Sequence, residues 1–394
     1  MPSIDKATDN GELKQRQPEQ ELVCVTGAGG FIGSWVVKEL LLRGYRVRGT
    51  ARDLVVSASD RKNAQLLALQ GAHERLTLCR ANVLDYDGLR AAFRGCKGVF
   101  HVASSVSNDP ASSLPLLCLL LEVSGFLQGP RTYLLHLHVL LVLQDLVPVT
   151  VEGTRNVISA AADADVRRVV FTSSYGAVHM DPNRSPDTVL DETCWSDYDF
   201  CKSTGPIAPP EFWPKLRHCC CAKMMAEITA TEEAAKRGLE LAVVVPSMTM
   251  GPMLQPALNF SSNHVARYLT GAEPTYPNAV ATYTDVHDVT HAHVLVYEHP
   301  EACGRYLCIG AVLHRTHFLQ LLSELFSQYH ITAKCEDDGK PMAKPYKFSN
   351  RRLTDLGLEF TPVRESLYER VTCLQKKGHL PLPVDPLAPK CAYL

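Results

Sequence analysis

Three glycines at regular spacing form the strongest local signal in this chain. Gly27, Gly30 and Gly33 give the pattern GxxGxxG directly after residues 22–26, an apolar run typical of a buried parallel strand. Residues 31–42 then continue with helical periodicity. In such a unit the first glycine permits a tight turn, the second lets the backbone approach a pyrophosphate, and the third permits close packing of helix on strand. The spacing therefore predicts a turn that binds the diphosphate of a dinucleotide.

The second expected strand, residues 45–50, ends near charged side chains that can discriminate between dinucleotides. Arg52 lies where such a site distinguishes a ribose 2′-hydroxyl from a 2′-phosphate, and an arginine there favours NADP(H). Asp53 keeps NAD open, because an acid in this region can bind the ribose hydroxyls. Lys62 either adds a second positive charge or is a solvated loop lysine. NADP(H) is therefore the expected cofactor.

The elements that must hold this turn follow a regular βαβ rhythm. We expect further strands at residues 76–81, 98–103 and 168–173, with helices at 86–93 and 152–164. This alternation predicts an α/β fold with a Rossmann-type, doubly wound parallel sheet. Ligands of open α/β sheets bind at the carboxyl ends of the strands, so the serines that end the last of these strands are expected near the ligand.

Composition points to a soluble globular protein. The 394 residues are 46% hydrophobic with a formal net charge of −2, which gives no general attraction to nucleic acid or membrane. Residues 1–20 are polar and predict a disordered tail without a secretory signal. The leucine-rich stretch 114–144 is interrupted too often to supply the roughly 20 apolar residues of a membrane span. Fourteen cysteines without CxxC pairs indicate free thiols in a reducing cytosol, and we expect a cytoplasmic monomer.

Longer blocks of the sequence resemble the plant cinnamoyl-CoA reductases, which belong to the extended short-chain dehydrogenase/reductase superfamily. The resemblance covers about residues 21–383, with two interruptions. Dihydroflavonol reductases share the fold and cofactor, but the segments DETCWSD and KKGHLPLP favour the cinnamoyl-CoA branch. The blocks that carry the resemblance are TGAGGFIGSWVVKELLLRGYRVRGTARD, GVFHVAS, VEGTRNVISAA, RRVVFTSSYGAV, DETCWSDYDFCKST, KPYKFSNRRLTDLGLEFTPV and KKGHLPLP.

The resemblance implies an activity and a division of the chain. Such enzymes use NADPH to reduce a hydroxycinnamoyl-CoA thioester to its aldehyde, releasing coenzyme A, on the route to lignin monomers. The acyl-CoA thioester is then the expected small-molecule partner. The expected divisions are a Rossmann domain at residues 21–250, a smaller substrate-binding lobe at 251–383 and a tail at 384–394.

Catalysis in the family uses a serine, a tyrosine and a lysine, with the tyrosine four residues before the lysine on one helix. Ser174 matches the serine and Lys223 the lysine, but Cys219 occupies the tyrosine position. Cysteine ends just beyond Cβ, so its thiol falls short of the approach of about 2.6–3.2 Å that proton transfer needs. His218 points about a quarter turn away and is a poor substitute. We therefore expect an impaired reductase; an inactive NADP-binding homologue with a binding or regulatory role, and a reductase of a dihydroflavonol-like ketone, are the alternatives.

Further residues take roles by the same resemblance. Cys201 and Cys220 match a redox-sensitive pair, although a proline-rich stretch separates them here. No metal site is expected from the cysteine run 219–221, because adjacent helical cysteines cannot all face one ion, and His264 and His287 are expected to pack or to face solvent. The residues expected around the cofactor are Gly27, Gly30, Phe31, Ile32, Gly33, Arg52, Lys62, Asn82, Val83, Val102, Ala103, Ser104, Lys223, Pro246, Thr249 and Ser261.

Two segments have no counterpart in the family pattern. One is the leucine- and histidine-rich stretch near residues 111–144, and the other is the proline-rich stretch at 205–217. Both border the expected site, and insertions of this length are unusual inside a compact domain. Their composition matches neither neighbour, so we interpret them as translated non-coding sequence or a mis-predicted gene model. The prolines of the second stretch also argue against a continuous helix there.

Overall fold

The structure is a computed structural model that describes residues 21–52, 63–103, 130–202, 213–336, 339 and 341–382. Two long helices begin at residues 130 and 213, and their side chains are described from residues 147 and 219 onward. The expected tails, most of both unmatched segments, Asp53, Lys62 and Ser104 lie outside the described residues.

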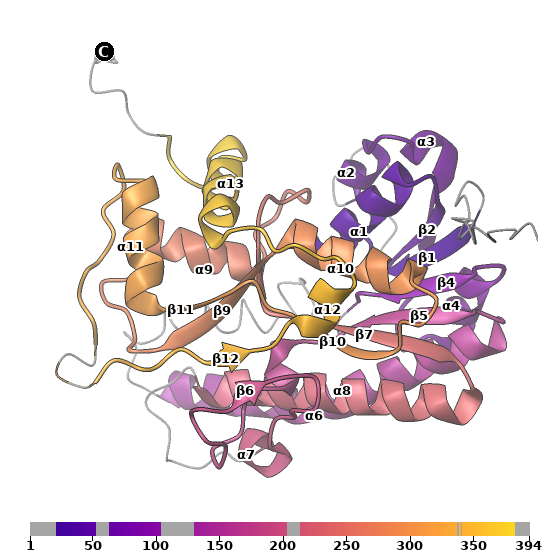
Figure 1. Cartoon of the computed structure of the whole chain (residues 1–394), viewed down its shortest axis with the longest axis horizontal. Helices are drawn as coiled ribbons and strands as arrows, with labels where there is room; N and C mark the ends of the chain where they lie inside the picture. The colour runs from indigo at the N-terminus through magenta and orange to yellow at the C-terminus, as the bar shows by residue number, and fades with distance from the viewer. Residues whose placement is uncertain are drawn as a thin grey trace, which may run out of the picture.

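A seven-stranded parallel sheet forms the centre of the molecule (Figure 1). Its order is β10-β7-β5-β4-β1-β2-β3, and every neighbouring pair is parallel. The chain fills one side of β1 and then returns to fill the other, so the order reverses between β1 and β4. This confirms the expected Rossmann-type sheet. The strands are β1 (Leu22–Thr26), β2 (Arg46–Ala51), β3 (Leu76–Arg80), β4 (Gly98–His101), β5 (Arg168–Thr172), β7 (Glu240–Pro246) and β10 (Gly304–Cys308).

Helices cover both faces of this sheet (Figure 1). Apolar side chains of each layer pack against opposite faces of the same strands, which buries both sides of the sheet as parallel sheets require. One layer contains α1 (Phe31–Leu42), α2 (Ala64–Leu67), α3 (Ala72–Arg75), α10 (Val286–Glu298) and α12 (Arg351–Asp355). The other contains α4 (Tyr86–Phe93), α6 (Pro130–Asp163) and α8 (Trp213–Arg237).

Helix α6 starts earlier than the sequence predicts, and helix α8 starts inside the second unmatched segment. Helix α6 was expected from residue 152 but begins at 130 and continues through Pro148, so residues 130–144 of the first unmatched segment are helical. Helix α8 begins at Trp213, inside the second unmatched segment, and Pro214 falls in its first turn, where a missing N–H costs little. Among the helices in the described ranges, none is both long and apolar enough to cross a membrane.

A smaller lobe packs at one end of the sheet (Figure 1). Its core includes Phe31 and Trp35 of α1, which tie the lobe to the glycine turn. The lobe contains a three-stranded sheet of β8 (Met248–Met250), β9 (Val280–Asp285) and β11 (Ala311–His314), with helices α9 (Phe260–Leu269), α11 (Arg315–Leu325) and α13 (Val363–Lys376). Short elements complete the described chain: η2 (Tyr175–Ala177), β6 (Val189–Leu190), α7 (Tyr198–Lys202) and β12 (Lys347–Phe348).

The chain passes between the Rossmann sheet and the smaller lobe more than once. Strand β10 pairs with β7 at the edge of the main sheet, and α10 packs on α1, although both follow residue 250. The second part of the chain therefore supplies an edge strand and a covering helix to the Rossmann sheet as well as the lobe.

Candidate active site

The glycine turn lies between β1 and α1, and two of its glycines admit no side chain. Gly27 has a φ of +66°, and a Cβ there would lie 2.9 Å from the Cα of Ala103. A Cβ on Gly33 would lie 2.2 Å from the carbonyl oxygen of Gly27. Gly30 is the N-cap of α1 and no side chain caps this helix, so the first-turn amides of Phe31 and Ile32 remain available to an anion. The turn therefore has the form that a diphosphate needs.

The point where the strand order reverses lies beside this turn. The side chains of Thr26 and His101, at the ends of β1 and β4, meet across it with Oγ1 and Nδ1 2.8 Å apart. The hydroxyl of Thr26 also accepts a hydrogen bond from the backbone N–H of Ala103. Val102 and Ala103, both expected at the cofactor, thus follow β4 directly at the crevice where doubly wound sheets bind ligands.

The other expected cofactor residues on this side follow β2 and β3. Arg52 is exposed just after β2, at the edge of the sheet where a ribose 2′-phosphate is expected. Asn82 is exposed after β3, where its side chain accepts a hydrogen bond from the N–H of Leu84. Val83 is half-buried, and its carbonyl accepts from the amide of Asn156. The structure thus brings these residues to one edge of the sheet.

Two adjacent serines follow β5, and their environments differ. Ser173 is buried and donates a hydrogen bond of 2.5 Å to Glu227. Ser174 is half-buried, caps η2, and accepts a hydrogen bond from the N–H of Gly176 at 3.2 Å. Acting as an acceptor leaves its hydroxyl hydrogen available. Of the two, Ser174 is therefore the one able to donate to a substrate oxygen.

Helix α8 presents Cys219, Lys223 and Glu227 at intervals of four residues, which places them along one face. Burial lowers the pKa of Lys223, and the nearby Cys219 thiol opposes that shift. Burial, together with the positive charge of Lys223, lowers the pKa of His101 to about 3. Lys223 therefore faces the same crevice as His101, with Cys219 one helical turn before it.

Glu227 anchors this helix through a buried ion pair that the sequence analysis missed. Its carboxylate accepts a 2.5 Å bond from Nε of Arg305 on β10, and burial raises its pKa while Arg305 opposes the rise. Arg305 also donates to the carbonyls of Glu192 and Cys194 and stacks over Trp195. The pair thus joins α8, β10 and the DETCWSD segment. The spacing of Glu227 from Lys223 was a usable signal, whereas nothing local marked Arg305.

Cys201 and Cys220 lie in one buried cluster with Met180 and Cys221. No disulfide joins Cys201 to Cys220, and burial raises the pKa of Cys220. A Cβ on Gly176 would lie only 2.8 Å from Sγ of Cys220, so the turn after Ser174 packs closely on α8. The cluster therefore fixes the distance between the serine turn and the lysine helix.

The remaining expected cofactor residues lie toward the lobe, and all three are buried. Pro246 ends β7, Thr249 lies in β8, and Ser261 lies in the first turn of α9. Arg370 of α13, which the sequence analysis missed, donates to the carbonyl of Thr249 and lies over the ring of Phe31, 4.6 Å from its centroid. This arginine links the lobe to the first residue of α1.

Sequence identity with known proteins distinguishes between the reductase families that share this architecture. Residues 27–196 match the NAD(P)H-binding family, and residues 143–310 match the NAD dependent epimerase/dehydratase family. Cinnamoyl-CoA reductase 1 of Oryza sativa subsp. japonica is 68% identical over 376 residues, covering 95% of this chain and 96% of the relative. The chain belongs to the cinnamoyl-CoA reductase family. Dihydroflavonol 4-reductase of Dianthus caryophyllus is only 30% identical, over 97% of this chain and 95% of that protein.

Among solved structures, vestitone reductase from alfalfa (Medicago sativa L.) matches with a TM-score of 0.69 and 26% identity, over 91% of this chain and 99% of the other. Membership of the cinnamoyl-CoA reductase family makes the chain an oxidoreductase with an NAD(P)H-binding Rossmann domain.

Proposed function

We propose that this protein is an NADPH-dependent reductase of hydroxycinnamoyl-CoA thioesters whose turnover is limited at one proton-transfer step. The observation that carries the proposal is the face of α8, where Lys223 points to the crevice and a thiol precedes it by one turn. The identity of 68% with a cinnamoyl-CoA reductase supports the substrate class.

The glycine turn and the strand ends hold the cofactor in this account. The Gly27 and Gly33 positions and the uncapped start of α1 fit a pyrophosphate, and the exposed Arg52 fits the 2′-phosphate of NADP(H) through charge-assisted hydrogen bonds. Bound NADPH supplies the hydride that reduces the thioester. We place the buried lobe residues Thr249 and Ser261 at the far end of the cofactor site.

The protein's own groups stabilise the charge that develops on the thioester oxygen. As hydride adds to the carbonyl carbon, Ser174 donates a hydrogen bond to the oxygen, which becomes negative, and the nearby Lys223 lowers the energy of that charge. Protonation of the oxygen gives a hemithioacetal. Its carbon–sulfur bond then breaks to release the aldehyde, and coenzyme A leaves as the thiol.

Cys219 limits the protonation in this scheme. A phenol on this helix face would extend several ångströms beyond Cβ, whereas the thiol stops close to the helix. Proton donation needs an approach of about 2.6–3.2 Å or an intervening water. We infer that Cys219 reacts through water or not at all, and that turnover is slow as a result.

Cys219 also favours a second candidate function, a homologue that binds NADP(H) without catalysis. Incubation of purified protein with NADPH and feruloyl-CoA, with product analysis for the aldehyde and free coenzyme A, separates the candidates. Slow, stoichiometric formation of both products supports the reductase. Cofactor binding with neither product supports the binding protein, and reduction of a dihydroflavonol alone would assign the enzyme to ketones.

Two further expectations belong to this proposal. A chain of this size with fourteen cysteines and without CxxC pairs suits a reducing compartment, so we place the protein in the cytoplasm. We also propose that it acts as a monomer.

A further inference from the structure

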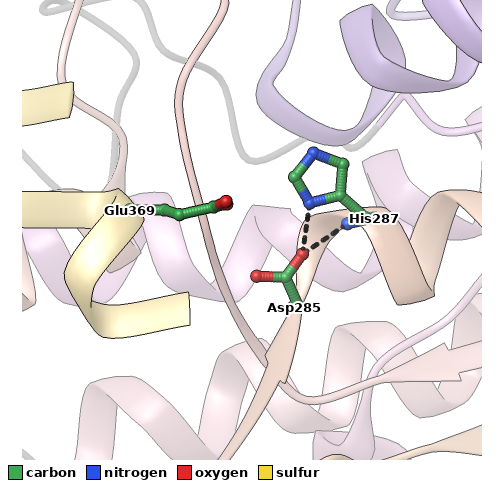
Figure 2. Close-up of side chains that lie close together, drawn as sticks. All are labelled: Asp285, His287 and Glu369. Carbon is green, nitrogen blue, oxygen red and sulfur yellow. Dashed lines mark hydrogen bonds and ion pairs between the residues drawn. The ribbon is translucent and has the colours of Figure 1, made fainter. Parts of the chain in front are cut away.

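A second group of chemically capable side chains lies where the lobe meets α10, away from the α8 face. Asp285 ends β9 and caps α10, His287 lies in the first turn of α10, and Glu369 lies on α13. Each side chain offers one ligand atom, and these atoms lie within 4.8 Å of one another. Figure 2 shows the three side chains converging from the junction of β9 with α10 and from α13.

Asp285 is the buried member of the group, and its two carboxylate oxygens have different surroundings. Oδ1 accepts hydrogen bonds from the ring Nδ1 of His287 at 2.7 Å and from its backbone N–H at 2.8 Å. Oδ2 is buried, and the hydroxyl of Ser366 on α13 lies beside it, but no hydrogen bond of standard geometry joins the two groups. This oxygen is therefore only weakly satisfied, and a bound cation would stabilise it.

His287 directs its Nδ1 atom toward Asp285 and Glu369, whereas its second ring nitrogen points away from them, so Nδ1 would be the ligand and a cation would replace the hydrogen that Nδ1 shares with Asp285 (Figure 2). The edge of its imidazole packs on Trp35 with centroids 4.4 Å apart, and the indole of Trp35 donates to the carbonyl of Pro252. The side chain of His287 is 45% exposed, so water and ions reach it. Glu369 is exposed and can rotate toward the other two groups.

The charged side chains around the group give it an excess of negative charge, which favours binding of a cation. Asp285 and Glu369 supply two negative charges, and Asp288 supplies a third, although its carboxylate already accepts from Thr361. Opposing them are Lys38, which lies over the ring of Trp35, and Arg370, which is occupied by Ser262 and the carbonyl of Thr249. No described lysine or arginine forms an ion pair with Asp285 or Glu369.

We propose that Asp285, His287 and Glu369 form a binding site for a divalent transition-metal cation of the zinc class. One imidazole nitrogen with two carboxylate oxygens is a ligand set that Zn²⁺, Co²⁺ and Ni²⁺ accept, with water completing the coordination. Metal–ligand bonds of about 2.0–2.2 Å would require side-chain rotations that bring the three ligand atoms closer together than their present spacing of up to 4.8 Å. The bound ion would connect the start of α10 to α13 beside Trp35, and so fasten the lobe to the helix that begins at the glycine turn. This inference does not depend on the proposed reductase activity.

Cobalt titration of the whole protein, freed of metal by a chelator, tests the site. Co²⁺ reports its ligands in its absorption spectrum, so nitrogen and oxygen ligation can be told from ligation by the chain's many thiols. We expect one site with nitrogen and oxygen ligands that Zn²⁺ displaces, and a higher melting temperature when metal is bound. Glu369→Gln should weaken this binding by at least about tenfold, as loss of groups around metal ligands commonly does, and His287→Gln should abolish it.

Matched controls come from the same helix and the same residue types. Glu365 is exposed on α13 one turn earlier, and His73 is almost fully exposed on α3. Glu365→Gln and His73→Gln should leave the cobalt spectrum unchanged. Because Glu369 is a surface residue, its variant should fold normally. A parent protein without the nitrogen and oxygen spectrum, or equal binding by the parent and Glu369→Gln, would overturn the proposal.

Discussion

The two halves of the candidate site depend on different parts of the chain: one on the backbone, the other on side chains. The half that follows β1 to β4 relies on backbone, with glycines that admit no side chain, an uncapped helix start and strand ends at the reversal point. In the proposed mechanism, the half on α8 depends on particular side chains, chiefly Lys223 and the residue at position 219. A backbone site tolerates many substitutions nearby, whereas a proton-transfer site depends on the reach of one group. One substitution can therefore remove chemistry and leave cofactor binding in place.

Placing a phenol at position 219 should have the largest effect of the changes proposed here, and the effect should be on turnover. Cys219→Tyr places a hydroxyl on the helix face shared with Lys223, and general acid–base catalysis is typically worth about 10²–10⁴-fold. We expect reduction of feruloyl-CoA at least tens of times faster than by the parent, measured as NADPH oxidation under saturating cofactor. Cys219→Phe is the matched control, because it supplies the ring without the hydroxyl. Equal rates for the Tyr and Phe variants would show that another group protonates the oxygen.

Removing the charge of Glu227 should test whether the α8 half is a rigid frame. Glu227→Gln leaves Arg305 as a buried charge without its carboxylate, and breaking such a pair costs about 3–5 kcal/mol of unfolding free energy. Denaturant unfolding measures the loss. Glu233→Gln on the same helix removes a partly exposed pair with Arg237 and should cost no more than about 1 kcal/mol. Similar losses for both would mean that the Glu227 pair does not anchor the helix.

Changing Arg52 should test the cofactor half. Arg52→Ala should weaken NADPH binding roughly ten- to a hundredfold, because a hydrogen bond to a charged group contributes about 1.5–3 kcal/mol. NADH has no 2′-phosphate, so its binding should scarcely change and serves as the internal control. Fluorescence titration with both cofactors decides the matter; equal losses would assign the selectivity to another residue.

A smaller effect, on the pH dependence of stability, is expected from replacing His101, which lies between the two halves of the site. Its pKa in the folded protein is about 3, below the usual 6.5, because burial and Lys223 disfavour the charged ring. The unfolded chain therefore binds the proton more readily, so stability is complete above pH 6.5 and falls as pH drops from 6.5 toward 3. The loss is about 1.4 kcal/mol per pH unit. His101→Asn should flatten this part of the stability curve, and parallel curves for parent and variant would contradict the assignment.

Much of the cofactor half could be predicted because its determinants are close in sequence. Residues 22–33 contain a strand, the glycines and a helix start, and local periodicity and spacing suffice to identify all three. The strands at residues 76–81 and 98–103 and the helix at 86–93 were likewise found within two residues of their observed bounds.

The parts that escaped prediction depend on contacts between distant segments. Arg305 meets Glu227 across 78 residues, and no local pattern reveals such a pair. The return of β10 to the main sheet and the meeting of Asp285 with Glu369 have the same origin. Helix α6 was underestimated for a different reason, since Pro148 and the unusual composition of the preceding segment hid its early start.

The separation of binding from chemistry is tested most directly by titrating NADPH into the parent and the Cys219→Tyr variant side by side. The account predicts that the two proteins bind NADPH with equal dissociation constants, because position 219 contributes to the proton-transfer half alone. A parent that fails to bind NADPH, or that gains affinity markedly with the tyrosine, would show that the two halves are not independent and would contradict the central claim.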